Sequence, residues 1–142
     1  MNGMLADVNI QGHLAYVRRL LVRSGLMPLM DDTNLRLVTF PELGLDRRID
    51  DRPLWNVCQQ GAWVLFTENR NQDGPNSLEA TLADSWKVVC LPVVTLANKG
   101  KFENSPDYAA RVADEVAEIL IDVANGGYRD QPRIYVPRAA SS

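Results

Sequence analysis

Acidic residues follow several of the apolar runs in this sequence, and their types and spacing suit one kind of chemistry. In chain order they are Asp7, Asp51, Glu68 and Asp73. Neighbouring carboxylates oppose each other's ionisation unless a cation lies between them, and Mg²⁺ or Mn²⁺ takes carboxylate and water oxygens as ligands. A metal held in this way activates water and neutralises charge on a phosphate. The acids therefore indicate metal-assisted hydrolysis of a phosphodiester.

Each acid also has a structural interpretation. Asp50 and Asp51 stand where the N-cap residues of a helix stand, and Asp73 begins an ordinary Asp-Gly-Pro turn. Asp7 has no such duty, because it lies in the apolar run Met4–Val8. An unpaired buried charge costs several kcal/mol, so a functional reason to keep it is needed as much as a structural one. For Asp7 we therefore give a site role and a structural role equal weight.

Strand-like and helix-like segments alternate along the chain. The expected strands are Met4–Val8, Leu35–Phe40, Trp63–Thr67, Val88–Leu96 and Ile134–Val136, and the expected helices begin near Gln11, Asp50, Asn76 and Ser105. We expect Trp63–Thr67 to be central, and Pro92 to mark an edge or a break. Alternation of this kind predicts an α/β fold, a three-layer α/β/α sandwich with a mainly parallel central sheet. Ligands of such sheets bind beyond the carboxyl ends of the strands, where the acids fall.

Composition places the chain in a broad class. With 142 residues, 46% of them hydrophobic and 23% charged, it is expected to form one domain over residues 1–142 with a flexible tail at 139–142. The sequence shows neither a secretion signal nor an apolar run of the roughly 20 residues that cross a bilayer, so we expect a cytoplasmic protein without a membrane partner. Two cysteines outside any C-x-x-C pair are expected to stay reduced. With a net charge of −3, the chain as a whole is not expected to attract nucleic acid, and only a local basic face could do so.

Three motifs in order give the chain a family resemblance. They are Asp7-Val8-Asn9, an Asp51 shortly before Leu54-Trp55, and Val64-Leu65-Phe66-Thr67 followed by the polar loop from Glu68 to Gly74. In this order they resemble the PIN-like domains, in particular a small subfamily whose first strand ends in Asp-x-Asn. The resemblance covers about Met4 to Leu96.

The resemblance implies a Mg²⁺- or Mn²⁺-dependent nuclease, most often a ribonuclease. Such domains are often the toxin half of a toxin-antitoxin pair, and they commonly form homodimers. By it, Asp7 is the central metal ligand, Asp51 the second acid, and Glu68 or Asp73 the acid from the third strand's loop. The family usually has acids where this chain has Asn69 and Asn71. Two alternatives follow: the acids are redistributed to Glu68 and Asp73, or the domain is inactive and acts as a protein-interaction or regulatory module.

Other residues near the same strand ends could contact substrate. These candidates are Asn9, Thr67, Asn69, Arg70 and Arg47. Thr67 could orient a ligand carboxylate, while Arg70 and Arg47 could contact RNA phosphates. A further rival is a receiver-like domain with Mg²⁺ beside a phosphoaccepting aspartate, and it is disfavoured because Lys99 and Lys101 are expected in a loop after Leu96.

Overall fold

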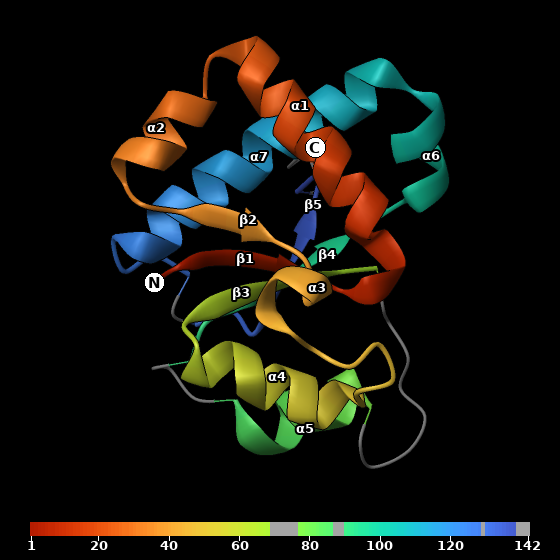
Figure 1. The fold of residues 1–142 in the computed structure, drawn as a ribbon, viewed down its shortest axis with the longest axis vertical. Coiled ribbons are helices and arrows are strands. Elements are labelled where there is room, and N and C mark those ends of the chain that lie inside the picture. Colours follow the sequence, from red (N-terminus) through yellow and green to blue (C-terminus); the bar gives the residue numbers. More distant parts are fainter. Residues whose placement is uncertain (69–76, 87–89, 129, 139–142) are drawn as a thin grey trace.

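Five parallel strands form the centre of the protein (Figure 1). The computed structural model describes residues 1–68, 77–86, 90–128 and 130–138. The strands are β1 (Gly3–Ala6), β2 (Arg36–Val38), β3 (Trp63–Thr67), β4 (Val93–Leu96) and β5 (Arg133–Val136). Helices cover both faces of the sheet (Figure 1), so the predicted α/β class and three-layer sandwich are confirmed.

The strand order is β2-β1-β3-β4-β5, which makes β3 the middle strand, as predicted. After β1 the chain forms β2 on one side, and it then crosses to the other side of β1 to form β3. This is one of the common doubly wound orders, and its topological switch point lies between β1 and β3. Because ligand crevices open at the carboxyl ends of the strands at such a point, the topology itself marks the ends of β1 and β3.

The two helical layers have different members. One face carries α1 (Gln11–Ser24), α2 (Met27–Asp32), α6 (Lys99–Asn104) and α7 (Pro106–Ala124), and the other carries α4 (Asp51–Gln60) and α5 (Leu78–Ser85) (Figure 1). Two short helices, η1 (Val8–Ile10) and α3 (Phe40–Leu43), follow β1 and β2. Side chains of a strand alternate between the faces, so Met4 and Ala6 join the core beneath α1 and α7, whereas Leu5 joins the core beneath α4 and α5. Burial on both faces explains the continuous apolar strands.

Local signals set several helix ends as the sequence predicts. The Ser77 and Ser105 hydroxyls accept hydrogen bonds from the backbone N–H of Ala80 and Tyr108, which caps α5 and α7. The predicted helix from Asp50 to Gly61 is confirmed as α4. Helix α1 ends at Gly25, whose positive φ of 78° is the usual left-handed C-cap.

Some predicted boundaries are wrong. The expected strand Leu35–Phe40 is confined to β2, because Thr39 and Glu42 form a capping box that begins α3. The strand predicted from Val88 begins only at Val93, after Pro92, and it pairs on both sides, so Pro92 marks a break and not an edge. Residues 87–89 lie outside the described residues.

Besides η1 and α3, two further helices were not anticipated. Lys99 and Lys101, expected in a loop, lie in α6, whose first turn is capped by the Asn98 side chain. Helix α2 also lacked a sequence signal strong enough to predict it. The proposed tail, 139–142, falls outside the part of the chain that is described. Within that part, no helix combines the length and the apolar character needed to span a bilayer.

The start of β1 depends on a close approach of two backbones. Gly3 has a φ of 136°, and a Cβ built there would lie 1.9 Å from the Arg36 carbonyl oxygen. By contrast, nothing lies within 4 Å of a Cβ built on Gly12 in α1. We expect Gly3→Ala to lower the free energy of unfolding by at least about 2 kcal/mol. The matched Gly12→Ala should be neutral or stabilising by up to about 1 kcal/mol. Urea denaturation of both variants tests this, and equal stabilities would contradict it.

Candidate active site at the carboxyl ends of β1 and β3

Asp7 and Thr67 meet at the switch point. Asp7 directly follows β1, and its backbone N–H donates to the Phe66 carbonyl oxygen at 2.8 Å. Its side chain is buried, and Thr67, the last residue of β3, donates from Oγ1 to Asp7 Oδ2 at 2.9 Å. Since β1 and β3 are paired in register at Ala6 and Phe66, this contact continues the pairing by one residue. The sheet therefore fixes the position of the Asp7 carboxylate.

Asp51 reaches the same region from α4, on the face of the sheet that carries Leu5 and Leu65. It is the first residue of α4, and its Oδ2 accepts a hydrogen bond of 3.1 Å from the backbone N–H of Leu78, the first residue of α5. The N-cap residue itself, Asp50, makes no side-chain cap hydrogen bond. Asp51 thus links the beginnings of two helices, where the helix dipoles favour negative charge.

Electrostatics couple the two acids. Burial raises the pKa of the Asp7 carboxyl, and the nearby negative charge of Asp51 raises it further. The hydrogen bond from Thr67 and the backbone N–H groups of Val8 and Asn9 act in the opposite direction, but the pKa of Asp7 remains above its ordinary value. The fold therefore keeps a carboxylate where ionisation is unfavourable, and a cation at this point would relieve the cost.

Cys58 forms part of the surroundings of Asp7. On α4, Asp51, Trp55 and Cys58 are spaced four and three residues apart, which places them on one face of the helix. Burial, and then the charge of Asp7, raises the pKa of the Cys58 thiol to about 12. The thiol is free and neutral at ordinary pH, as expected for a reduced core cysteine, and it is unsuited to metal binding without losing its proton.

Glu68 takes a different direction. It follows Thr67, its side chain is about one-third exposed, and its Oε1 lies 3.8 Å from Nζ of Lys99 at the start of α6. Among the described residues, no set of three or more His, Cys, Asp or Glu side chains is close enough to hold a metal ion. Asp73, the fourth predicted acid, lies outside the described residues. The structure thus places Asp51 near enough to Asp7 for its charge to act on that carboxyl, and it directs Glu68 towards Lys99.

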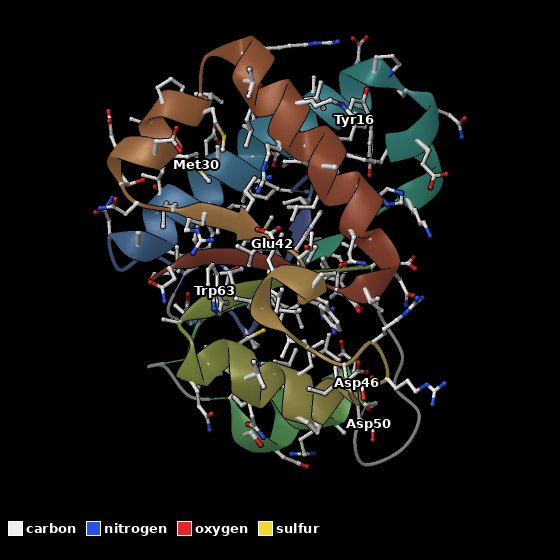
Figure 2. All side chains as sticks on the ribbon, in the orientation of Figure 1. Tyr16, Met30, Glu42, Asp46, Asp50 and Trp63 are labelled. Atoms are coloured by element: carbon white, nitrogen blue, oxygen red, sulfur yellow. The ribbon has the colours of Figure 1, made fainter. Side chains whose placement is uncertain are left out.

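The remaining predicted contacts are scattered around this edge. Asn9 is exposed on η1, and Arg47 is exposed between α3 and α4, the segment on which Figure 2 labels Asp46 and Asp50. Asn69, Arg70 and Asn71 are outside the described ranges. Of the other arginines, Arg18 donates to the Leu37 carbonyl oxygen, and Arg52 pairs with Asp84 at 2.9 Å. These two arginines connect separate elements of the fold.

Sequence reasoning missed two participants. One is the Leu78 N–H that binds Asp51, which the helix start at Ser77 could have suggested. The other is Lys99, which became a candidate only once its segment proved to be helical.

No family model, curated protein or solved structure matches the chain.

Replacing Asp7 should stabilise the protein. The folded pKa of Asp7 is raised, so its charge destabilises the fold above that pKa, and the penalty disappears below the ordinary value of 3.8, where folded and unfolded chains are both protonated. Asn retains an oxygen that can accept from Thr67. We expect Asp7→Asn to stabilise the fold at pH 7 by about 0.5–2 kcal/mol, a typical gain at a strained functional position. Thermal denaturation from pH 3 to pH 8 tests this. A gain that is independent of pH, or a loss at pH 7, would contradict the electrostatic account.

The Thr67 hydroxyl should matter most when Asp7 is ionised. Thr67→Val removes a hydrogen bond to a charged group, which is worth roughly 1.5–3 kcal/mol, and the loss should shrink in acid. The control is Thr81→Val, another fully buried threonine, whose hydroxyl donates to the Ser77 carbonyl oxygen. Its cost should be about 1 kcal/mol with little dependence on pH. Denaturant titrations at two pH values distinguish the two variants.

Proposed function

We propose that this protein is a PIN-like nuclease that uses Mg²⁺ or Mn²⁺ to hydrolyse RNA, with Asp7 and Asp51 as its central acids. The observation that carries the proposal is the buried carboxylate of Asp7 beside Asp51 at the switch point of the sheet. Asp7 stands at the N-cap of η1 and receives the backbone N–H groups of Val8 and Asn9, but capping alone does not account for its burial against the Thr67 hydroxyl near the negative charge of Asp51.

The donor set fits such a metal. Mg²⁺ is commonly bound by one or two carboxylates, with water and substrate phosphate completing its shell. Asp7 and Asp51 would hold it, and Glu68 and Asp73 are the acids that the loop after β3 could add. When bound, the metal lowers the pKa of water and offsets negative charge on the phosphate.

The chain's own residues orient these ligands. Thr67 fixes Oδ2 of Asp7, and the Leu78 N–H fixes Oδ2 of Asp51. Because both donors belong to regular elements, the carboxylates are held before any ligand arrives, which limits the ordering needed on binding. Lys99 and Arg47 supply positive charge around the same edge, where a phosphate backbone would otherwise meet only acids.

Cleavage of a labelled single-stranded RNA tests the proposal. We expect cleavage with Mn²⁺ or Mg²⁺, none with a chelator, and a loss of at least about 100-fold in Asp7→Asn and Asp51→Asn, because even residues that only support metal ligands contribute 10- to 100-fold. Asp50→Asn is the matched control, since Asp50 is exposed and adjacent to Asp51 but makes no side-chain cap hydrogen bond, and it should remain within about two-fold of the wild type. In calorimetric titrations, Mn²⁺ should bind the wild type and Asp50→Asn more tightly than Asp7→Asn and Asp51→Asn.

A second candidate is a catalytically inactive PIN-like domain that binds a protein, such as an antitoxin-like partner or a second copy of the chain. Asn69 and Asn71 favour it, because amide oxygens bind these metals more weakly than carboxylates. The same experiments separate the two candidates: absence of both Mn²⁺ binding and cleavage in the wild type would overturn the nuclease and favour the binding module.

A further inference from the structure

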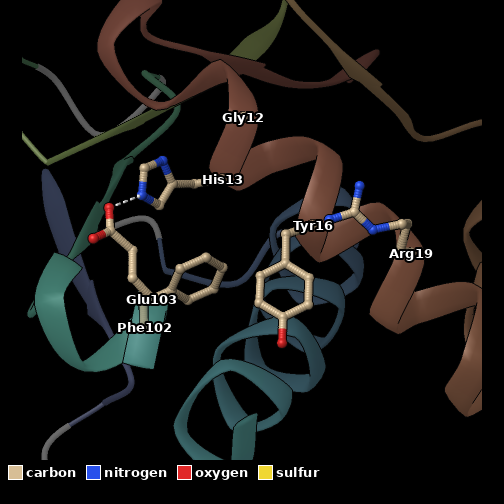
Figure 3. Close-up of a pocket in the computed structure, with 6 residues that line it drawn as sticks. All are labelled: Gly12, His13, Tyr16, Arg19, Phe102 and Glu103. Carbon is tan, nitrogen blue, oxygen red and sulfur yellow. Dashed lines mark hydrogen bonds and ion pairs between the residues drawn. The ribbon is translucent and has the colours of Figure 1, made fainter. Parts of the chain in front are cut away.

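A pocket of about 320 Å³ opens between α1 and α6 (Figure 3), and neither Asp7 nor Asp51 lines it. Its lining residues are Gly12, His13, Tyr16, Arg19, Phe102 and Glu103. The volume is within the range of small-ligand sites, and the lining is largely apolar, with a few charged groups, as such sites usually are.

Three rings form its wall. The Tyr16 and Phe102 rings meet edge to face with centroids 5.4 Å apart, and the His13 imidazole lies 5.5 Å from the Phe102 ring. Phe102 is buried, so the half-buried Tyr16 is the more accessible ring. The guanidinium of Arg19 lies 5.4 Å from the centre of the Tyr16 ring, with the side chain itself exposed. A planar aromatic ligand that carries an anion matches this combination of rings and cation.

The pocket is connected to the candidate active site through the chain itself. Helix α1 follows Asp7 and η1 at the end of β1, and α6 begins at Lys99, shortly after β4. Strands β1 and β4 are the two neighbours of β3, whose end carries Thr67 and Glu68. Asp51 approaches from α4, on the opposite face of the sheet. A chain of nucleotides that joins the acid pair to the pocket would therefore pass across the carboxyl end of β3, beside Lys99.

We propose that this pocket binds one nucleobase of a single-stranded RNA whose backbone crosses the carboxyl end of β3. The inference rests on the proposed nuclease function and adds to it a binding site for one unpaired base of the substrate. In an RNA duplex the bases are stacked and paired, so only an unpaired base can be placed against protein rings. The Arg19 side chain is positioned to contact the phosphate attached to that base.

Glu103 adds a preference among bases. Its Oε1 is held by Nε2 of His13 at 2.8 Å, which fixes the carboxylate beside the pocket. A carboxylate accepts hydrogen bonds from exocyclic amino groups, such as that of cytosine, and uracil has none. The pocket should therefore favour cytosine over uracil.

Binding of fluorescent five-nucleotide oligo(C) and oligo(U), measured by anisotropy with a chelator present, tests the inference without any metal-dependent step. Both oligonucleotides carry the same charge, so their difference reports on the base. We expect oligo(C) to bind more tightly to the wild type, Tyr16→Leu to weaken it at least about five-fold, and Glu103→Gln to reduce the preference. Arg23→Gln is the control, because Arg23 lies one turn beyond Arg19 on α1 and does not line this pocket. Thermal denaturation checks that each variant is folded.

The outcomes separate the pocket from the nuclease. Base-dependent binding that needs Tyr16, with no cleavage in any metal, supports the pocket and overturns the nuclease. Cleavage whose KM is unchanged by Tyr16→Leu, or equal cleavage of duplex and single strand, overturns the pocket and leaves the nuclease standing. Absence of oligonucleotide binding also overturns the proposed base-binding pocket. The same holds if the pocket binds an aromatic side chain of a partner protein instead of a base.

Discussion

The hydrogen bond between Thr67 and Asp7 is the contact on which the organisation of this edge of the protein depends. It joins the ends of the two strands that meet at the switch point, and it does so with a buried, unfavourably ionised carboxylate. Everything else at this edge is arranged around that carboxylate: Asp51 arrives from α4, Cys58 supplies a neutral neighbour, and Leu78 holds Asp51 in place. The surrounding sheet provides the rigidity, because both strands are paired on each side.

Much of this architecture is readable from the sequence, for reasons that differ between elements. The apolar run Trp63–Thr67 predicted the middle strand because a strand covered on both faces must be apolar throughout, and Ser105-Pro106 predicted the start of α7 because capping is a local signal. The strand predicted over Leu35–Phe40 was too long because a capping box competes with strand geometry at Thr39. Helix α6 was missed because it is short and lies among polar residues.

The site was harder to anticipate than the fold. Asp7 could be singled out as a charge in an apolar run, although the structure places it just after β1, at the N-cap of the unpredicted η1. The association of Asp7 with Asp51 depends on the crossing from β2 to β3, which no spacing along the chain specifies. The direction taken by Glu68, towards Lys99, depends on a helix that was not predicted. Local signals thus predicted the elements, whereas the meeting of distant side chains had to come from topology.

The bond between Asp51 and the Leu78 N–H has a consequence for communication within the molecule. Helix α4 belongs to the connection from β2 to β3, and α5 to the connection from β3 to β4, so this one bond joins two successive crossovers at their ends. Any change in the charge on Asp51 is transmitted directly to the first peptide group of α5. The Leu78 amide proton is in this way a spectroscopic reporter within the backbone, whose resonance follows the environment of the Asp51 carboxylate.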